Sequence, residues 1–218
     1  MPPAGRTKAI QDLIDCGGDA IKRSAWFEAE LVLDRSLAMS HGRHDHTGMA
    51  EIIALLATVR ASICKEALAS RTAIRIIDDA VTDTMKVERG RYLIQPPLVG
   101  ADARRLRLLA TAQEVPVVVL CREPRTQLGL TPIVAIGPLG AIRCRIKSPE
   151  REDKPTAGWF RDALLQLGNA TVERIDPAQN LPRRLDAVLG LLDTVPEDAG
   201  LHLLAIEICE EAARAAAE

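Results

Sequence analysis

The spacing of small and apolar residues near the N-terminus constrains the fold of this chain more than any other feature. Apolar residues recur three and four positions apart at about residues 7–23 and again at about 26–40, which is the spacing of one face of an α-helix. Gly17 lies in the first stretch, and Ala29 and Leu33 lie in the second. Small residues such as Gly17 and Ala29 allow two helices to cross closely. The spacing therefore predicts a helical hairpin.

A third apolar stretch, at about residues 49–69, predicts another helix with Thr47 as its N-cap. The order and spacing of Gly17, Ala29 and Leu33 resemble the tetratricopeptide repeat, a stacking pair of helices with small residues where the helices cross. The hairpin and the third helix together resemble one and a half such repeats.

The C-terminal part of the chain resembles the same repeat more loosely, over residues 159–175 and 195–212. Members of this family bind peptides or partner proteins on the surface of stacked hairpins. The resemblance therefore implies a surface presented to a partner, without catalysis. Because an isolated repeat cannot bury its apolar face, helices from the two ends of the chain, or another domain, must complete the stack.

The middle of the chain changes from helical to strand periodicity. The continuous apolar run at 117–121 is typical of a strand buried on both faces, and Arg91 to Cys121 has the length of a strand–helix–strand crossover. Residues 73–77 fit a strand or a helix end, and their β-branched side chains favour a strand. The turn at 137–140 joins two further strands in a predicted hairpin.

These changes divide the chain into residues 1–71, 72–150 and 151–218. We expect a mixed α+β fold, in which repeat-like helical hairpins flank a small α/β domain of four or five strands. The third segment is expected to be helical and to be able to pack with the first. The charged, proline-bounded stretch at 149–155 is the predicted linker between the second and third segments.

The composition excludes several classes of protein. Only five aromatic residues are present, too few for the stacking platforms of single-stranded nucleic-acid binders, so nucleic acid is a disfavoured partner. The five cysteines form no CxxC pair, which argues against a zinc ribbon or a dithiol redox site and favours reduced, buried thiols. Phosphate-loop, GxGxxG, HExxH and GxSxG motifs are absent. No cofactor or metal is therefore predicted, and we lean against an enzyme.

The sequence also predicts where in the cell the protein is located. The start of the sequence has no apolar core typical of a signal peptide, and no apolar run approaches the roughly 20 residues of a membrane span. We therefore expect a cytoplasmic protein without a membrane partner. Richness in alanine, arginine and leucine suggests a bacterial origin.

Charge is distributed unevenly along the chain. Residues 86–154 contain 13 Lys and Arg against 7 Asp and Glu, whereas residues 155–218 contain 5 against 11. Two interpretations are open: the segments dock on one another, which we favour, or the basic middle binds an anionic partner.

The best candidate for a basic surface lies on the last predicted strand and the predicted central helix. Three basic residues alternate with apolar ones along that strand, so they share one face. Such a cluster can hold phosphate or an acidic peptide, but basic residues on an edge strand also block aggregation. The residues are Arg104, Arg105, Arg107, Arg143, Arg145 and Lys147.

A second candidate lies where the central strands end, because open α/β sheets bind ligands at the carboxyl ends of their strands. Cys121 ends a buried strand and is either an activated thiol or, more commonly for such a position, a core residue. The residues expected to converge there are Asp78, Asp79, Gln95, Cys121, Arg122 and Glu123.

Three histidines, His41, His44 and His46, lie in the predicted turn before the third helix. Imidazoles are common metal ligands, but solvated loop histidines are the favoured interpretation. Taken together, the sequence predicts a non-catalytic interaction or adaptor protein that binds a protein partner or itself, through a helical surface and a basic sheet face. The alternative is an enzyme or small-ligand binder with its site near residues 121–124.

Overall fold

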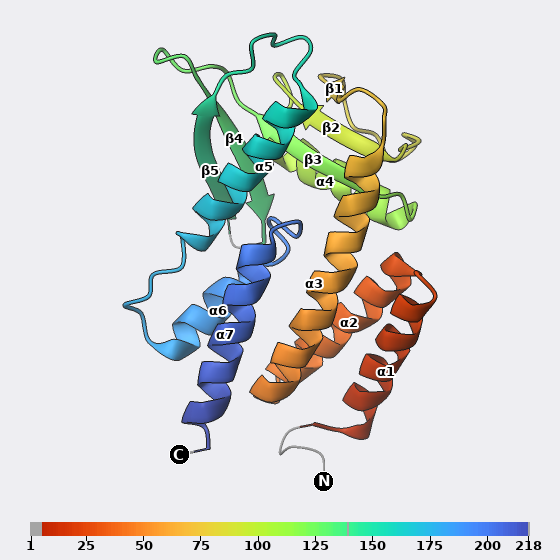
Figure 1. Ribbon diagram of the computed structural model, residues 1–218, viewed down its shortest axis with the longest axis vertical. Coiled ribbons are helices and arrows are strands. Elements are labelled where there is room, and N and C mark those ends of the chain that lie inside the picture. The colour runs from red at the N-terminus through yellow and green to blue at the C-terminus, as the bar shows by residue number, and fades with distance from the viewer. Residues whose placement is uncertain (1–5, 139, 218) are drawn as a thin grey trace. The chain divides into compact units, whose positions relative to one another are not determined.

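The computed structural model describes residues 6–138 and 140–217, and it shows helices before and after a five-stranded sheet along the chain (Figure 1). The predicted mixed α+β class is confirmed. Position 139, inside the predicted 137–140 turn, lies outside the described residues. The elements are α1 (Lys8–Lys22), α2 (Trp26–His41), α3 (His46–Ala69), β1 (Arg75–Ile77), β2 (Gly90–Ile94), α4 (Gly100–Ala112), β3 (Val117–Arg122), β4 (Leu130–Gly137), β5 (Gly140–Lys147), α5 (Ala157–Val172), α6 (Leu181–Leu191) and α7 (Ala199–Ala215).

The chain folds into two compact units, each assembled from separate segments. The helical unit comprises the described parts of Met1–Ser62, Ile175–Leu189 and Ala199–Glu218. The α/β unit comprises Ile63–Arg174 and Gly190–Asp198. Both ends of the chain therefore contribute helices to one unit.

The first hairpin of the helical unit is built on close contact between α1 and α2. A Cβ placed on Gly17 would lie only 2.7 Å from Leu33 Cδ2, so the absence of a side chain there lets the two helices approach. Ala29 and Leu33 are fully buried, as their positions in the apolar face require. Thr7 caps α1 by accepting a hydrogen bond from the Ile10 N–H at 3.3 Å.

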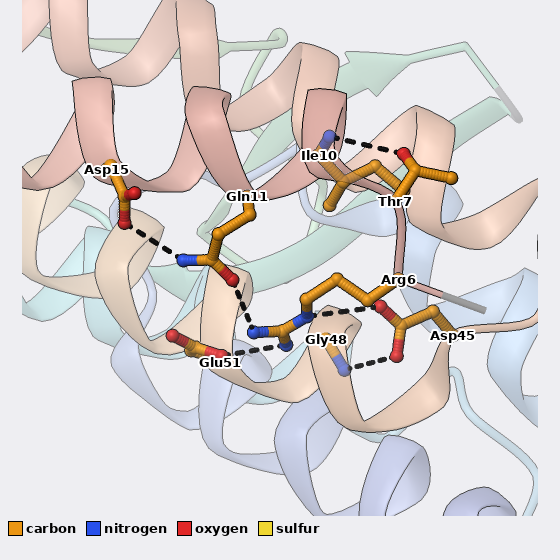
Figure 2. A network of polar contacts seen from close by, with 8 residues as sticks. All are labelled: Arg6, Thr7, Ile10, Gln11, Asp15, Asp45, Gly48 and Glu51. Carbon is orange, nitrogen blue, oxygen red and sulfur yellow. Dashed lines mark hydrogen bonds and ion pairs between the residues drawn. The ribbon is translucent and has the colours of Figure 1, made fainter. Parts of the chain in front are cut away.

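The predicted N-cap of the third helix is wrong, because α3 begins at His46 and Thr47 lies inside it. Asp45 takes the role instead: its carboxylate accepts a hydrogen bond from the Gly48 N–H at 2.9 Å (Figure 2). A carboxylate also interacts favourably with the positive end of the helix dipole, which explains why aspartate takes precedence over threonine. Arg6 contacts Asp45 at 3.5 Å and Glu51 at 2.8 Å, and thereby joins the N-terminal segment to α3.

The sheet of the α/β unit has the strand order β1-β2-β3-β4-β5. β1, β2 and β3 are parallel, whereas β3, β4 and β5 pair antiparallel. The predicted crossover is confirmed by β2, α4 and β3, and the predicted hairpin by β4 and β5. Residues 73–77 contain a strand, β1, which pairs with β2 from Arg75 opposite Tyr92 to Ile77 opposite Ile94.

The two faces of the sheet are covered by different helices. α4 packs against β2, β3 and β4, in a core that includes Tyr92, Val119 and Val134. Ile142 and Ile146 of β5 point to the opposite face, where α5 packs against β4 and β5. The Trp159 indole N–H of α5 donates to the Lys147 carbonyl at 2.9 Å, which holds α5 at the end of β5.

Candidate functional site

The basic side chains of β5 stand on the face of the sheet that α4 covers elsewhere. Arg143 pairs in register with Val134, which belongs to the α4 core, and Arg145 and Lys147 follow at alternate positions. Because α4 packs on β2, β3 and β4, this face of β5 is left to solvent, and all three basic side chains are exposed. We call Arg143, Arg145 and Lys147 the basic row.

Only the first member of the basic row has an acidic partner in the described part of the chain. The Arg143 guanidinium donates twice to Glu123, from Nη2 at 2.8 Å and from Nε at 3.0 Å. The hydrogen bond and charge of Glu123 raise the pKa of Arg143. Arg145 and Lys147 form no ion pair among residues 6–138 and 140–217. Two uncompensated positive charges therefore project from β5.

The arginines of α4 that were predicted to extend the basic surface are engaged differently. Arg107 donates from Nη1 to the carbonyls of Asp193 at 3.2 Å and Thr194 at 3.1 Å. Arg105 pairs with Asp83 at 2.9 Å, and Arg104 is half-buried. Arg107 thus contacts the 190–198 segment of its own unit.

The structure brings three of the residues predicted at the carboxyl ends of the strands together. Gln95, just after β2, donates to Asp78 Oδ2 at 3.1 Å, and Asp78 follows β1. Arg122, the last residue of β3, donates to Gln95 Oε1 and to the Glu152 carbonyl. Burial lowers the pKa of Arg122, although the charge of Glu152 opposes this effect. These groups satisfy one another in a chain of hydrogen bonds.

The remaining residues predicted for this site have different surroundings. Cys121 is fully buried, and its burial raises the pKa of the thiol to about 12, so it holds its proton near neutral pH. Glu123 turns to Arg143 on β5. Asp79 lies exposed in the loop after β1. The strand ends thus present a polar seam formed by Asp78, Gln95 and Arg122.

A pocket of about 530 Å³ lies in the helical unit, and the sequence did not predict it. His41 at the end of α2, His44 in the following turn and His46 at the start of α3 line it, together with residues of α6, of the end of α7 and just after α7. The three histidines of the SHGRHDH sequence were a signal for a site at this place. That sequence did not indicate which apolar residues would lie opposite the histidines. The lining residues are His41, His44, His46, Leu181, Pro182, Leu185, Asp186, Ala212, Ala215 and Ala216.

The histidines of the pocket differ in their surroundings. His41 Nε2 lies 3.2 Å from Asp186 Oδ1, at the exposed rim. The rings of His44 and His46 lie with their centres 6.1 Å apart. Burial lowers the pKa of His46, and the neighbouring His44 and His41 lower it further. His46 Nδ1 is buried without a hydrogen-bond partner in the described structure.

Comparison with known protein families, characterised proteins and solved structures finds no match to this chain. Within residues 6–138 and 140–217, no group of three or more His, Cys, Asp or Glu side chains is arranged to hold a metal ion. None of the helices described for this chain combines the length and hydropathy needed to cross a membrane.

Proposed function

We propose that this protein is a non-catalytic interaction protein that binds an acidic, extended segment of a protein partner along the edge strand β5. The observation that carries the proposal is the basic row, whose members Arg145 and Lys147 are exposed and lack an acidic partner in the described chain. Positive charges in fixed alternation on a strand offer a complementary surface to carboxylates at the same spacing.

The place of β5 in the sheet supports binding by strand addition. β5 is the last strand in the order β1-β2-β3-β4-β5, so β4 pairs with one of its two edges. An extended peptide on the other edge would gain backbone hydrogen bonds from the strand and specificity from alternate side chains. Residues of such a peptide that lie opposite the basic row would be acidic.

The same row argues against a second copy of this chain as the occupant of the edge. Two β5 strands paired antiparallel in one continuous sheet would place their basic side chains opposite each other on one face. Like charges directly opposite in a sheet are destabilising. The basic row therefore favours an acidic partner and disfavours pairing of two β5 edges. Charged residues on edge strands commonly prevent such self-association.

The enzyme alternative is less well supported by the strand ends. Asp78, Gln95 and Arg122 hydrogen-bond to one another, and Cys121 is buried with a pKa of about 12. An acid–base or nucleophilic mechanism needs a side chain that can change its protonation or attack at neutral pH. The polar seam is better explained as a structural connection between the three parallel strands.

Fluorescence anisotropy with a fluorescein-labelled peptide of alternating glutamate and valine tests the proposal. We expect saturable binding that weakens as salt is raised, because exposed charges are screened within about 10 Å at 0.1 M ionic strength. The double variant Arg145→Glu/Lys147→Glu should bind at least ten-fold more weakly. A lysine–valine peptide should not bind.

The matched control is Arg161→Glu/Arg183→Glu, which makes the same change in net charge at two other exposed positions. This control should bind the glutamate–valine peptide like the unmodified protein. Equal losses in the two double variants would show that overall charge, and not β5, attracts the peptide. Unchanged binding by Arg145→Glu/Lys147→Glu would show that the interface lies elsewhere.

A further inference from the structure

The pocket of the helical unit combines one aliphatic wall with one wall of imidazoles. Six of the ten lining residues are leucine, proline or alanine, contributed by α6 and by the C-terminal end of α7. The other four are three histidines and Asp186. A volume of about 530 Å³ lies within the usual range of roughly 300–1,000 Å³ for small-molecule sites. The pocket thus has the volume that an amphipathic ligand requires, with an apolar side for its chain and a polar side for its head group.

The polar wall has capacity for hydrogen bonds that the chain itself does not use. His46 Nδ1 is buried and has no hydrogen-bond partner in the described structure, and leaving a buried polar atom unsatisfied is unfavourable. The ring centres of His44 and His46 are 6.1 Å apart. The two oxygens of one carboxylate can bridge such a gap with N–H···O distances of about 2.7–3.2 Å.

Asp186 is the acidic residue among those that line the pocket, and it already pairs with His41. An incoming anion near His44 and His46 would therefore not have to displace an existing ion pair.

We propose that this pocket binds a small monocarboxylate with an aliphatic chain, with its carboxylate at His44 and His46 and its chain against Leu185, Ala212 and Ala215. The proposal is independent of the peptide site on β5, because the pocket belongs to the helical unit and β5 belongs to the α/β unit. Burial of the aliphatic chain contributes affinity, and the imidazoles orient the ligand.

The four histidines of this protein provide a direct readout, because His41, His44 and His46 line the pocket and His202 does not. We would titrate octanoate into protein carrying isotope-labelled histidine and follow the imidazole resonances by NMR. We expect saturable shifts of His44 and His46, while His202, buried on α7, stays in place. His44→Gln and His46→Gln assign the two signals.

Two partial ligands separate the contributions of chain and carboxylate. Acetate has the carboxylate without the chain, and 1-octanol has the chain without the carboxylate. Each should bind at least ten-fold more weakly than octanoate. Equal binding of 1-octanol would overturn carboxylate recognition by the histidines, and equal binding of acetate would overturn the role of the aliphatic wall.

A pair of alanine substitutions locates the binding. Ala215→Leu fills the pocket from its exposed rim and should weaken octanoate binding at least ten-fold. Ala217→Leu makes the same change two residues later, outside the lining, and should leave binding unchanged. Octanoate binding that survives Ala215→Leu, or an absence of saturable histidine shifts in the unmodified protein, would overturn the proposal.

Discussion

Among single residues, the five cysteines show how burial affects the reactivity of a thiol in this fold. Cys16 lies exposed on α1. Burial raises the pKa of Cys64, Cys121 and Cys209 to about 12, and that of Cys144 to about 11. The thiolate is the nucleophilic form, and a thiol with a pKa of 12 is about one part in 10⁴ thiolate at pH 8. Four of the five cysteines are therefore expected to react slowly in the native state.

We accordingly expect one rapidly reacting thiol per chain when the native protein is treated with Ellman's reagent at pH 8. All five should react in guanidinium chloride, where burial is lost. Raising the pH from 8 towards the pKa of the buried thiols should increase their reaction, provided that the fold survives. Cys16→Ser should abolish the rapid phase, whereas Cys121→Ser should retain it. A rapid phase that persisted in Cys16→Ser would show that a second thiol is activated.

At the scale of the element, the contact between α1 and α2 can be tested with two adjacent glycines. A Cβ at Gly17 would lie 2.7 Å from Leu33, whereas a Cβ at Gly18 would meet nothing within 4 Å. Gly18→Ala should stabilise the protein by about 0.5–1 kcal/mol, because alanine favours the interior of a helix. Gly17→Ala gains the same preference but overpacks the hairpin at a cost of about 1–3 kcal/mol.

Urea unfolding followed by circular dichroism checks this prediction. The midpoint should fall for Gly17→Ala and rise for Gly18→Ala, relative to the unmodified protein. Because the two substitutions are chemically identical and adjacent on α1, the difference between their effects isolates the contact with Leu33. Equal stabilisation by both would mean that α1 and α2 are not in close contact at this point.

Elements were the part of this structure that sequence patterns predicted best. Regular spacing of apolar residues is a local signal, and it located the α1–α2 hairpin and the strands on either side of α4. The start of α3 was missed because the spacing of apolar residues does not identify the residue that caps a helix. The role of Asp45 as the cap depends on the Gly48 N–H and on Arg6, which lies 39 residues before Asp45. Contacts between residues far apart in the sequence do not produce a periodic pattern of apolar residues.

The candidate sites show the same limit more strongly. The alternation along β5 predicted the basic row, because one strand contains all of it. The apolar wall of the pocket comes from α6 and α7, more than 130 residues after the histidines, and no local pattern connects them. The hydrogen-bond partners of Arg107 could not be predicted from the sequence either, since they are backbone carbonyls of residues 193 and 194. Sites built within one element are predictable, whereas those assembled between elements require the fold.

At the scale of the whole molecule, the division into two units predicts two separable unfolding transitions. Each unit contains one of the two tryptophans: Trp26 lies on α2 in the helical unit, and Trp159 lies on α5 in the α/β unit. Both are half-buried, so their fluorescence will change when the surrounding unit unfolds. The variants Trp159→Phe and Trp26→Phe leave a single reporter for one unit at a time.

A reciprocal pair of core substitutions tests this division. Ile208 on α7 and Leu120 on β3 are both almost completely buried, and truncating either to alanine should cost about 2–5 kcal/mol. Ile208→Ala should lower the urea midpoint reported by Trp26 more than that reported by Trp159, and Leu120→Ala should do the reverse. With urea m-values of about 1–3 kcal/mol/M, these shifts are measurable. If each substitution moved both midpoints equally, the two units would unfold as one cooperative structure. The simplest physical explanation would then be α3, which is continuous across the boundary between residues 62 and 63.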